Sequence, residues 1–284
     1  MNNSKLKPIL SEIWIYPVKS LGGISLNEAE VTERGLQYDR RWLIVDEQNR
    51  FLTQRTFPQM VFMGISLIIE NNQLKSITFT DKTAKFDNYN LLNPERKNVE
   101  SNKVMVQIWD DQVEAFEIKD GINDWLSNAL GIKCRLVYMP NSTKRKVDSN
   151  YAISGDEITS FSDAYPYLII GNEALKLLNS KLEKSISMDR FRPNFVFEGG
   201  LAHEEDNWFN FQIGEAEFTG VKNCARCVIP TINHKTALFG KEPLKTLSSY
   251  RFKNNKILFG QNLLVNKIGK VKLGDSILIL SIKN

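Results

Sequence analysis

The sequence has few of the residues that build metal centres and disulfide frameworks. Its 284 residues include three cysteines and two histidines. Three cysteines cannot supply the four thiolates of an iron–sulfur cluster. A zinc site would have to combine Cys224 and Cys227 with His203 and His234, and these spacings match no common zinc pattern. We therefore expect neither an iron–sulfur cluster nor a structural zinc ion within this chain.

Long apolar runs and a strong net charge are also missing. No run approaches the roughly 20 apolar residues of a membrane-spanning helix, and residues 1–7 lack the apolar stretch of a signal peptide. A net charge of +4 is too weak to imply nucleic-acid binding, although a local anion site remains compatible with it. The composition predicts a globular cytoplasmic protein with reduced thiols and without a membrane or nucleic-acid partner.

Short segments rich in β-branched and aromatic residues run along the whole chain and predict strands. Tight turns are expected at Gly214-Glu215, Gly269-Lys270 and Gly274-Asp275. Many short strands with close turns favour one or more barrels over a parallel sheet, so the predicted class is mainly β with a few helices (α+β). The expected strands cover residues 12–16, 41–46, 104–108, 134–138, 167–170, 194–197, 211–213, 216–221, 262–266 and 276–281.

Two segments have the apolar spacing of amphipathic helices. One begins at Asn172, a residue that can cap a helix, and extends through Lys181. The other runs from Ile122 to Leu130, and Gly131 occupies the position where glycine commonly ends a helix. We interpret both apolar stripes as faces that pack against the core.

Two polar stretches interrupt the strand pattern. Residues 80–102 are rich in Asp, Asn and Lys and predict a long loop or insertion, while residues 139–150 predict a loop or a linker between domains. The second stretch contains the basic run Lys144-Arg145-Lys146, which we interpret as solvated surface.

The cysteine pair Cys224 and Cys227 is the strongest chemical signal. A thiolate is a good ligand for soft metals, and the adjacent guanidinium of Arg226 favours the deprotonated form. A thioredoxin-like redox pair would open a helix, but residues 228–231 contain a proline and β-branched residues, which disfavour one. Metal ligation, redox cycling and simple packing therefore remain alternatives at this point.

Arginines flanked by aromatic residues recur beside the predicted strands. A buried arginine requires an anion or an acidic partner, whereas an isolated one is more simply a surface ion-pair member. Several arginines converging on one cleft would suit a phosphate-bearing ligand. These cationic segments are residues 17–20, 38–42, 53–55, 190–194 and 248–251.

A series of short motifs follows one another in a fixed order over nearly the whole chain. They are YPVKS (16–20), RGL (34–36), DRRW (39–42), FSDAYP (161–166), FRPN (191–194), CARC (224–227), LSSYR (247–251), FGQN (259–262) and VKLGD (271–275). Each motif is weak alone, but the ordered set resembles the MOSC-domain proteins of the molybdenum cofactor, including the β-barrel domain that commonly precedes MOSC. The likeness is closest to the mitochondrial amidoxime-reducing component and its bacterial relatives.

This resemblance implies a MOSC N-terminal β-barrel domain over residues 1–125 and a MOSC-type β-barrel domain over residues 126–284. It further implies an oxidoreductase that uses a molybdenum–molybdopterin cofactor to reduce N-hydroxylated compounds such as hydroxylamines, amidoximes and N-hydroxylated bases. A non-enzymatic carrier or insertion protein for the cofactor or its sulfur is the alternative. A structural β protein with a cofactor-free thiol pair is a third possibility.

The matching motifs imply a site for the cofactor. Cys227 corresponds to the metal ligand and is therefore the candidate catalytic residue, whereas Cys224 and Cys134 are expected to be packed thiols. Ala225 stands where some relatives carry serine. Residues implied to bind the pterin or its phosphate are Lys19, Ser20, Arg40, Arg192, Asn194 and Arg226, with Ser162 and Asp163 in a loop beside it and Tyr250 and Arg251 in a further matching motif.

The sequence departs from the family at its two ends. Mitochondrial members carry an N-terminal membrane anchor, and some bacterial relatives carry a C-terminal ferredoxin domain. Neither is expected here, so a reductase of this kind would receive electrons from a separate ferredoxin- or flavin-type protein.

Overall fold

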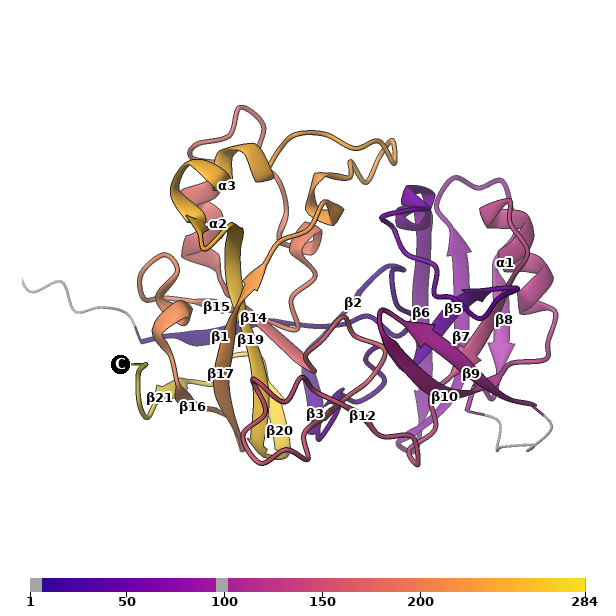
Figure 1. Cartoon of the computed structure of the whole chain (residues 1–284), viewed down its shortest axis with the longest axis horizontal. Coiled ribbons are helices and arrows are strands. Elements are labelled where there is room, and N and C mark those ends of the chain that lie inside the picture. Colours follow the sequence, from indigo (N-terminus) through magenta and orange to yellow (C-terminus); the bar gives the residue numbers. More distant parts are fainter. Residues whose placement is uncertain (1–6, 96–101, 284) are drawn as a thin grey trace, which may run out of the picture.

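The computed structural model describes residues 7–95 and 102–283 and consists of two lobes that lie side by side (Figure 1). The polar N-terminal stretch, up to residue 6, and residues 96–101 of the predicted long loop lie outside the described residues. Within the described part of the chain, no helix is long and apolar enough to span a bilayer. The protein is mainly β with a few helices, which confirms the predicted class.

The C-terminal lobe is built on one large mixed sheet. Its strands are β1 (Ile9–Ile15), β2 (Ile24–Leu26), β14 (Tyr167–Gly171), β15 (Phe195–Glu198), β16 (Asn210–Ile213), β17 (Ala216–Ala225), β18 (Phe252–Lys253), β19 (Lys256–Lys267) and β21 (Ile277–Ile279). The order is β2-β1-β15-β14-β19-β17-β16-β21, with β18 paired to β19. β14 and β15 are parallel, and the other neighbouring strands of this sheet pair antiparallel. The sheet therefore combines strands from near both ends of the sequence.

The N-terminal lobe contains two smaller antiparallel sheets and one α-helix. The elements are β5 (Trp42–Asp46), β6 (Met63–Glu70), β7 (Gln73–Asp81), β8 (Tyr89–Leu92), β9 (Lys103–Ile108), β10 (Asp111–Glu117), β11 (Cys134–Tyr138), α1 (Ile122–Leu130) and the 3-10 helix η1 (Pro58–Phe62). The sheet orders are β5-β11-β10-β9 and β6-β7-β8. Gly131 takes a left-handed conformation with φ 69°, so α1 ends where the sequence predicts.

Two further short sheets are present. Their strands are β3 (Glu28–Thr32), β4 (Gly35–Leu36) and β20 (Gly269–Lys272) in one, and β12 (Arg145–Lys146) and β13 (Ile158–Thr159) in the other. β20 pairs with β3, so Gly269 and Lys270 form part of a strand and the expected turn at these residues is wrong. The division expected after residue 125 falls inside α1, and the assignment of domain boundaries stays a prediction.

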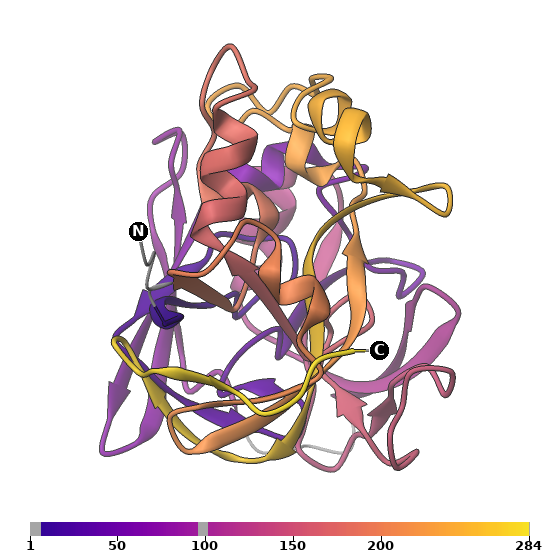
Figure 2. The same ribbon diagram turned by 90° about the vertical axis from the view of Figure 1, so that its left-hand side faces the viewer.

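The two α-helices of the C-terminal lobe lie together at one end of it in both views (Figures 1 and 2). α2 buries Leu175 and Leu178 and α3 buries Leu247 in a cluster with Phe259 of β19. α2 confirms the predicted helix, although it ends two residues earlier, and α3 has no counterpart in the prediction. The elements are α2 (Asn172–Asn179), α3 (Leu244–Arg251) and the 3-10 helices η3 (Met188–Phe191), η4 (Glu204–Asn207) and η5 (Ile229–Thr231).

One cluster of buried apolar side chains extends through both lobes. It joins Ile13 and Phe195 of the large sheet to Ile44, Phe79 and Leu126 of the N-terminal lobe. Continuous packing of this density resists relative movement of the elements it connects. The two lobes are therefore held against each other, and any surface between them has walls of defined shape.

Glu205, in η4, is a fully buried carboxyl group. Its Oε1 accepts a 3.3 Å hydrogen bond from the Gly171 amide, while Oε2 has no partner among the described residues. Burial, followed by the charge of Asp206, raises the pKa of Glu205 from 4.5 to about 7. The folded protein thus binds this proton more tightly than the unfolded chain, and stability falls as pH rises from 4.5 to 7.

The variant Glu205→Gln is expected to remove this pH-dependent loss. The difference in Tm, variant minus parent, should grow as pH rises from 4.5 to about 7 and stay level above that value. Thermal unfolding across this range measures it, and Glu198→Gln at an exposed position serves as the control. A difference that does not change with pH would contradict the expectation.

Candidate functional site

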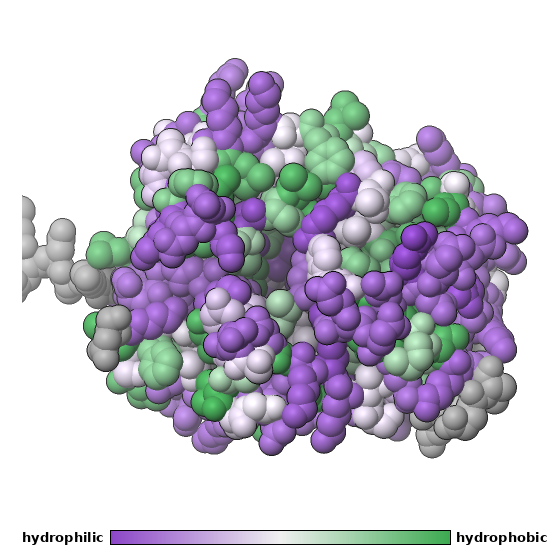
Figure 3. Space-filling view, in the orientation of Figure 1, coloured by the Kyte–Doolittle hydropathy of each residue, from purple (hydrophilic) through white to green (hydrophobic). Residues whose placement is uncertain are grey.

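A cleft lies between the two lobes, with a cavity volume of about 290 Å³. The space-filling view shows the surface hollowed there and bordered by hydrophilic residues (Figure 3). Its walls come from the segments around residues 19–20, 40 and 55 on one side, and from residues 162–168, 190–194 and 222–230 on the other. The cleft thus joins parts of the chain that are far apart in the sequence.

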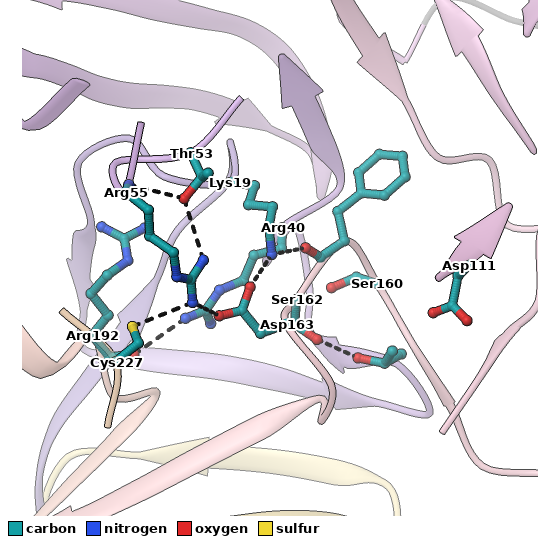
Figure 4. A network of polar contacts seen from close by, with 12 residues as sticks. Lys19, Arg40, Thr53, Arg55, Asp111, Ser160, Ser162, Asp163, Arg192 and Cys227 are labelled. Atoms are coloured by element: carbon teal, nitrogen blue, oxygen red, sulfur yellow. Dashed lines mark hydrogen bonds and ion pairs between the residues drawn. The ribbon is translucent and has the colours of Figure 1, made fainter. Parts of the chain in front are cut away.

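Most residues implied by the motifs meet in this cleft. Asp163 and Arg192 lie near Cys227 in the close-up view, together with Lys19 and Arg40 (Figure 4). The fold therefore brings together side chains whose proximity only the resemblance implied. The implied residues that line the cleft are Lys19, Ser20, Arg40, Ser162, Asp163, Arg192, Asn194, Arg226 and Cys227.

Three of these residues have an unusual backbone conformation. Ser20, Arg40 and Arg192 have φ values of 70°, 48° and 55°, in the left-handed region that non-glycine residues rarely adopt. Such conformations persist only where the surroundings impose them, and they concentrate at functional sites. Three such residues line this one cleft, which supports its interpretation as a functional site.

Two arginines lie against the ring of Tyr16. The guanidinium carbons of Arg40 and Arg192 are 4.4 and 4.2 Å from the ring centroid. Arg40 forms a 2.5 Å ion pair with buried Asp39, whereas Arg192 donates to the Leu21 carbonyl at 2.8 Å. Burial lowers the pKa of Arg192 to about 10, with the nearby charge of Arg40 contributing. Within this cradle of two arginines and Tyr16, the charge of Arg40 is paired with Asp39, whereas Arg192 has no ion-pair partner among the described residues.

Asn194 connects this cradle to the large sheet. Its Oδ1 accepts from Arg40 at 3.1 Å, and its Nδ2 donates to Asp39 and to the Trp14 carbonyl, both at 3.1 Å. Because the side chain is almost completely buried and its amide atoms are engaged by protein groups, Asn194 holds the arginine in place at the cleft wall.

Lys19 and Asp163 form a second charged group in the cleft. The Lys19 Nζ lies 2.6 Å from Asp163 Oδ1 and donates to the Phe161 carbonyl at 2.8 Å. Burial lowers the pKa of Lys19 to about 8 against the attraction of Asp163. Burial alone would raise the pKa of Asp163, but Lys19 and Arg55 together hold it well below its usual range. Asp163 is therefore a carboxylate at neutral pH.

The loop that carries Ser162 and Asp163 is held from behind by Arg145. This guanidinium donates to the carbonyls of Ser160, Ser162 and Asp163 at 3.1, 2.6 and 3.1 Å, and Nε pairs with Asp111 at 2.7 Å. Arg145 is buried, so the interpretation of the whole basic run as solvated surface is wrong for this residue. Composition cannot separate it from its exposed neighbours, because only the fold brings the three carbonyls together.

Replacing Arg145 by methionine is expected to loosen this loop and destabilise the protein. Three carbonyls would lose a charged donor in a buried position, which should lower the free energy of unfolding by about 3 kcal/mol. Denaturant unfolding measures the change, and Lys146→Met, at the neighbouring exposed position, is the control. Equal effects of the two replacements would show that Arg145 has no special role.

Cys227 is half-buried at the cleft wall, just beyond the end of β17. Its Sγ lies 3.3 Å from Nη2 of Arg55, which also pairs with Asp163 Oδ2 at 2.9 Å. Arg226, the sequence neighbour expected to act on this thiol, donates instead to the Phe191 carbonyl at 3.2 Å. The guanidinium beside the sulfur therefore comes from the N-terminal lobe, and the expectation for Arg226 is corrected.

The other two cysteines lie in apolar surroundings. Cys134 is buried in the core of the N-terminal lobe, as predicted. Cys224 also lines the cleft but packs against the cluster beneath α2 and α3, and burial raises the pKa of its thiol. Cys224 is therefore less suited than Cys227 to act as a thiolate ligand.

Tyr250 and Arg251 do not line the cleft. Arg251 pairs with Asp206 at 2.6 Å and donates to the Leu258 carbonyl at 3.0 Å, which ties α3 to η4 and β19. Tyr250 packs beside His203, with 5.9 Å between the ring centroids. We therefore leave these two residues out of the proposed site.

Residues that the motifs did not assign to the site also line the cleft. Its described lining holds seven cationic side chains against one carboxylate, Asp163. The motifs assign four of these cations, Lys19, Arg40, Arg192 and Arg226, and do not assign Arg55, Arg190 and Lys222. Arg226 Nε and Tyr165 Oη are buried and have no hydrogen-bond partner among the described residues. Unsatisfied donors in a cationic cleft fit an anionic ligand, and the planar guanidinium of arginine is well suited to bind phosphate.

The chemistry of the donor set also bears on a metal. Among the described residues, no group of three or more His, Cys, Asp or Glu side chains could hold an ion. A metal at Cys227 would therefore need most of its ligands from a bound molecule. Sulfur is a ligand for soft metals, so a phosphate-bearing cofactor that carries its own metal fits this lining.

Comparison with known proteins gives two family matches and relatives that align over most of this chain. The MOSC N-terminal beta barrel domain matches residues 7–133 and the MOSC domain matches residues 156–278. Mitochondrial amidoxime-reducing component 1 of Mus musculus is 32% identical over 95% of this chain and 82% of its own length, and component 2 of Homo sapiens is 33% identical over 94% and 82%. Molybdenum cofactor sulfurase of Oryza sativa subsp. japonica is 32% identical over 92% of this chain but 33% of its own length. Among solved structures, the YuaD protein from Bacillus subtilis is 10% identical over 96% of both chains, with a TM-score of 0.42.

Proposed function

Because this chain belongs to the family of MOSC-domain proteins with a MOSC N-terminal β-barrel domain, we propose that it is a molybdenum cofactor-dependent reductase of N-hydroxylated compounds. The relatives named amidoxime-reducing components align over almost the whole chain, which supports a related activity. The observation that carries the proposal is the position of Cys227, a half-buried thiol in the wall of a cleft dominated by cations.

The lining of the cleft matches the parts of such a cofactor. Cys227 would provide the protein ligand to molybdenum, because a thiolate is a favourable ligand for this soft metal. Arg40 and Arg192 would bind the phosphate, with Arg226 Nε as a further donor. Bound molybdenum would supply two-electron redox chemistry, while the protein supplies orientation and electrostatics.

The proposed reaction breaks an N–O bond. An N-hydroxylated substrate takes up two electrons and two protons and yields the reduced nitrogen compound and water, with the electrons coming from a separate ferredoxin- or flavin-type protein. Asp163 remains ionised and half of its side-chain surface is exposed, so it can accept a hydrogen bond from the substrate. Lys19, with a pKa near 8, keeps a proton at neutral pH beside this carboxylate.

The test is to express the protein in a host that makes the molybdenum cofactor. We expect near-stoichiometric molybdenum per chain by elemental analysis, and reduction of benzamidoxime with dithionite-reduced methyl viologen as electron source. Preparations made without cofactor synthesis are the control. Zinc or no metal in the first preparation would overturn the proposal.

A second candidate function is transfer of the cofactor or its sulfur to another enzyme. The identity of 32% with a plant molybdenum cofactor sulfurase favours it, although this chain spans only 33% of that protein. The two candidates share the thiol and the cationic cleft. Release of intact cofactor to an apo-enzyme, without turnover of any N-hydroxylated probe, would support the carrier instead of the reductase.

A further inference from the structure

Arg55 connects two parts of the site that belong to different segments. Its Nη2 lies 2.9 Å from Asp163 Oδ2 and 3.3 Å from Cys227 Sγ, and these two contacts are drawn in Figure 4. Arg55 itself lies in the N-terminal lobe, between β5 and η1. One nitrogen of that lobe thus touches both the proposed metal ligand and the cleft's carboxylate.

Arg55 is itself held in position. Its backbone amide and Nη1 both contact Thr53 Oγ1, at 3.2 and 3.3 Å. Its guanidinium carbon lies 4.8 Å from the ring centroid of Trp109. An arginine fixed at its base and along its planar face loses little further freedom when it forms the contacts in the cleft.

Trp109 has a conformation that needs an explanation. It lies in the turn between β9 and β10 with φ 54°, a left-handed value that is unusual for a bulky side chain. Phe51 packs against it edge to face at 5.0 Å. The strained turn presents the indole ring to Arg55, as expected where backbone strain is retained for the sake of a site.

We infer that Arg55 is a positioning residue through which the N-terminal lobe holds the Cys227 sulfur and the Asp163 carboxylate at a fixed spacing, with Trp109 as its support. The guanidinium is suited to this role because its planar fork carries several donors in a rigid arrangement. A lysine would offer a single flexible point charge instead.

Arg55 would have a second effect when a metal is bound to the sulfur. Hydrogen bonds to metal-bound sulfur raise the reduction potential, because they stabilise the more electron-rich state. Arg55 would therefore tune the metal as well as place its ligand. This second part rests on the proposed function, whereas the positioning of the two segments does not.

The first experiment uses the protein without cofactor and measures hydrogen exchange in residues 160–164 and 225–228. Arg55→Met is expected to speed exchange in both segments about tenfold, because an interaction with charged groups is lost. Arg55→Lys can still pair with Asp163, so only residues 225–228 should exchange faster. Arg50→Met removes an exposed arginine of the same lobe and should change neither segment.

The second experiment uses protein loaded with cofactor in the same series. Arg55→Met should keep its molybdenum but show a lower reduction potential and a kcat reduced about 10- to 100-fold for benzamidoxime. Unchanged exchange in both segments would overturn the positioning role. An unchanged potential with normal metal content would overturn the tuning role. Failure of the parent protein to take up molybdenum would instead refute the proposed function, and the exchange experiment would still decide the positioning.

Discussion

Replacing Cys227 by alanine should abolish both molybdenum retention and reduction of N-hydroxylated substrates. The described residues contain no cluster of His, Cys, Asp or Glu side chains that could take over the metal. Of the three cysteines, all of which the structure describes, only Cys227 contacts the Arg55 guanidinium. Removal of its sulfur leaves the metal without its protein ligand. Elemental analysis and turnover of benzamidoxime on the same preparations measure the two losses.

Cys224→Ala is the matched control for this prediction. Cys224 is three residues away and also lines the cleft, but its thiol packs against apolar side chains and burial raises its pKa. We expect this variant to retain most of its molybdenum and activity, since alanine fills a similar apolar position. Equal losses in the two variants would count against Cys227 as the specific ligand.

Arg192→Met should weaken cofactor binding strongly while making the cofactor-free protein more stable. Methionine has a similar length but cannot donate to a phosphate, and loss of a charge-assisted hydrogen bond typically corresponds to an affinity about 10- to 100-fold lower. Molybdenum content after extensive dialysis and a titration with isolated cofactor would show this loss.

The gain in stability follows from the surroundings of Arg192. Burial lowers the pKa of its guanidinium to about 10 from 12.5. The guanidinium is therefore charged below about pH 10, and burying this charge lowers the stability of the folded protein throughout that range. Removing the charge relieves this cost and the repulsion from Arg40. We expect the Tm of the cofactor-free protein to rise by a few degrees at neutral pH.

A control distinguishes this gain from a general effect of removing arginines. Arg135 pairs with Glu117 at 2.8 Å and with Asn49 at 2.5 Å, so its charge is well compensated. Arg135→Met should lower the Tm and leave cofactor binding unchanged. A lower Tm for Arg192→Met as well would mean that its hydrogen bond to Leu21 outweighs the cost of burying the charge.

The sequence predicts the secondary structure where periodicity and local geometry agree. The strand expected at residues 134–138 and the helix ending before Gly131 are confirmed. It fails where pairing depends on distant segments. β8, inside the predicted long loop, is a strand because β7 lies beside it, and Gly269 belongs to β20 because β3 pairs with it.

The candidate site divides in the same way. Ordered motifs pick out nine residues that the fold gathers in one cleft. Arg55 contacts Cys227, more than a hundred residues away in the sequence, and Arg145 donates to carbonyls of the loop that carries Ser162. No local sequence pattern identifies such partners. Tyr250 and Arg251 belong to a motif that predicts site residues, but they do not line the cleft, and Arg251 instead ties α3 to its neighbours.

The pairing of β1 with β15 also has a consequence for synthesis of the protein. Ile13 pairs with Phe195, so the first strand leaves the ribosome long before its partner exists. β1 can pair early with β2, but until β15 is made the other edge of β1 has to stay unpaired or be shielded by a chaperone. Such distant contacts also slow folding, because the long intervening chain must be closed into a loop first. The large sheet of this protein therefore cannot be completed until most of the chain has been synthesised, although its first strand is among the first segments made.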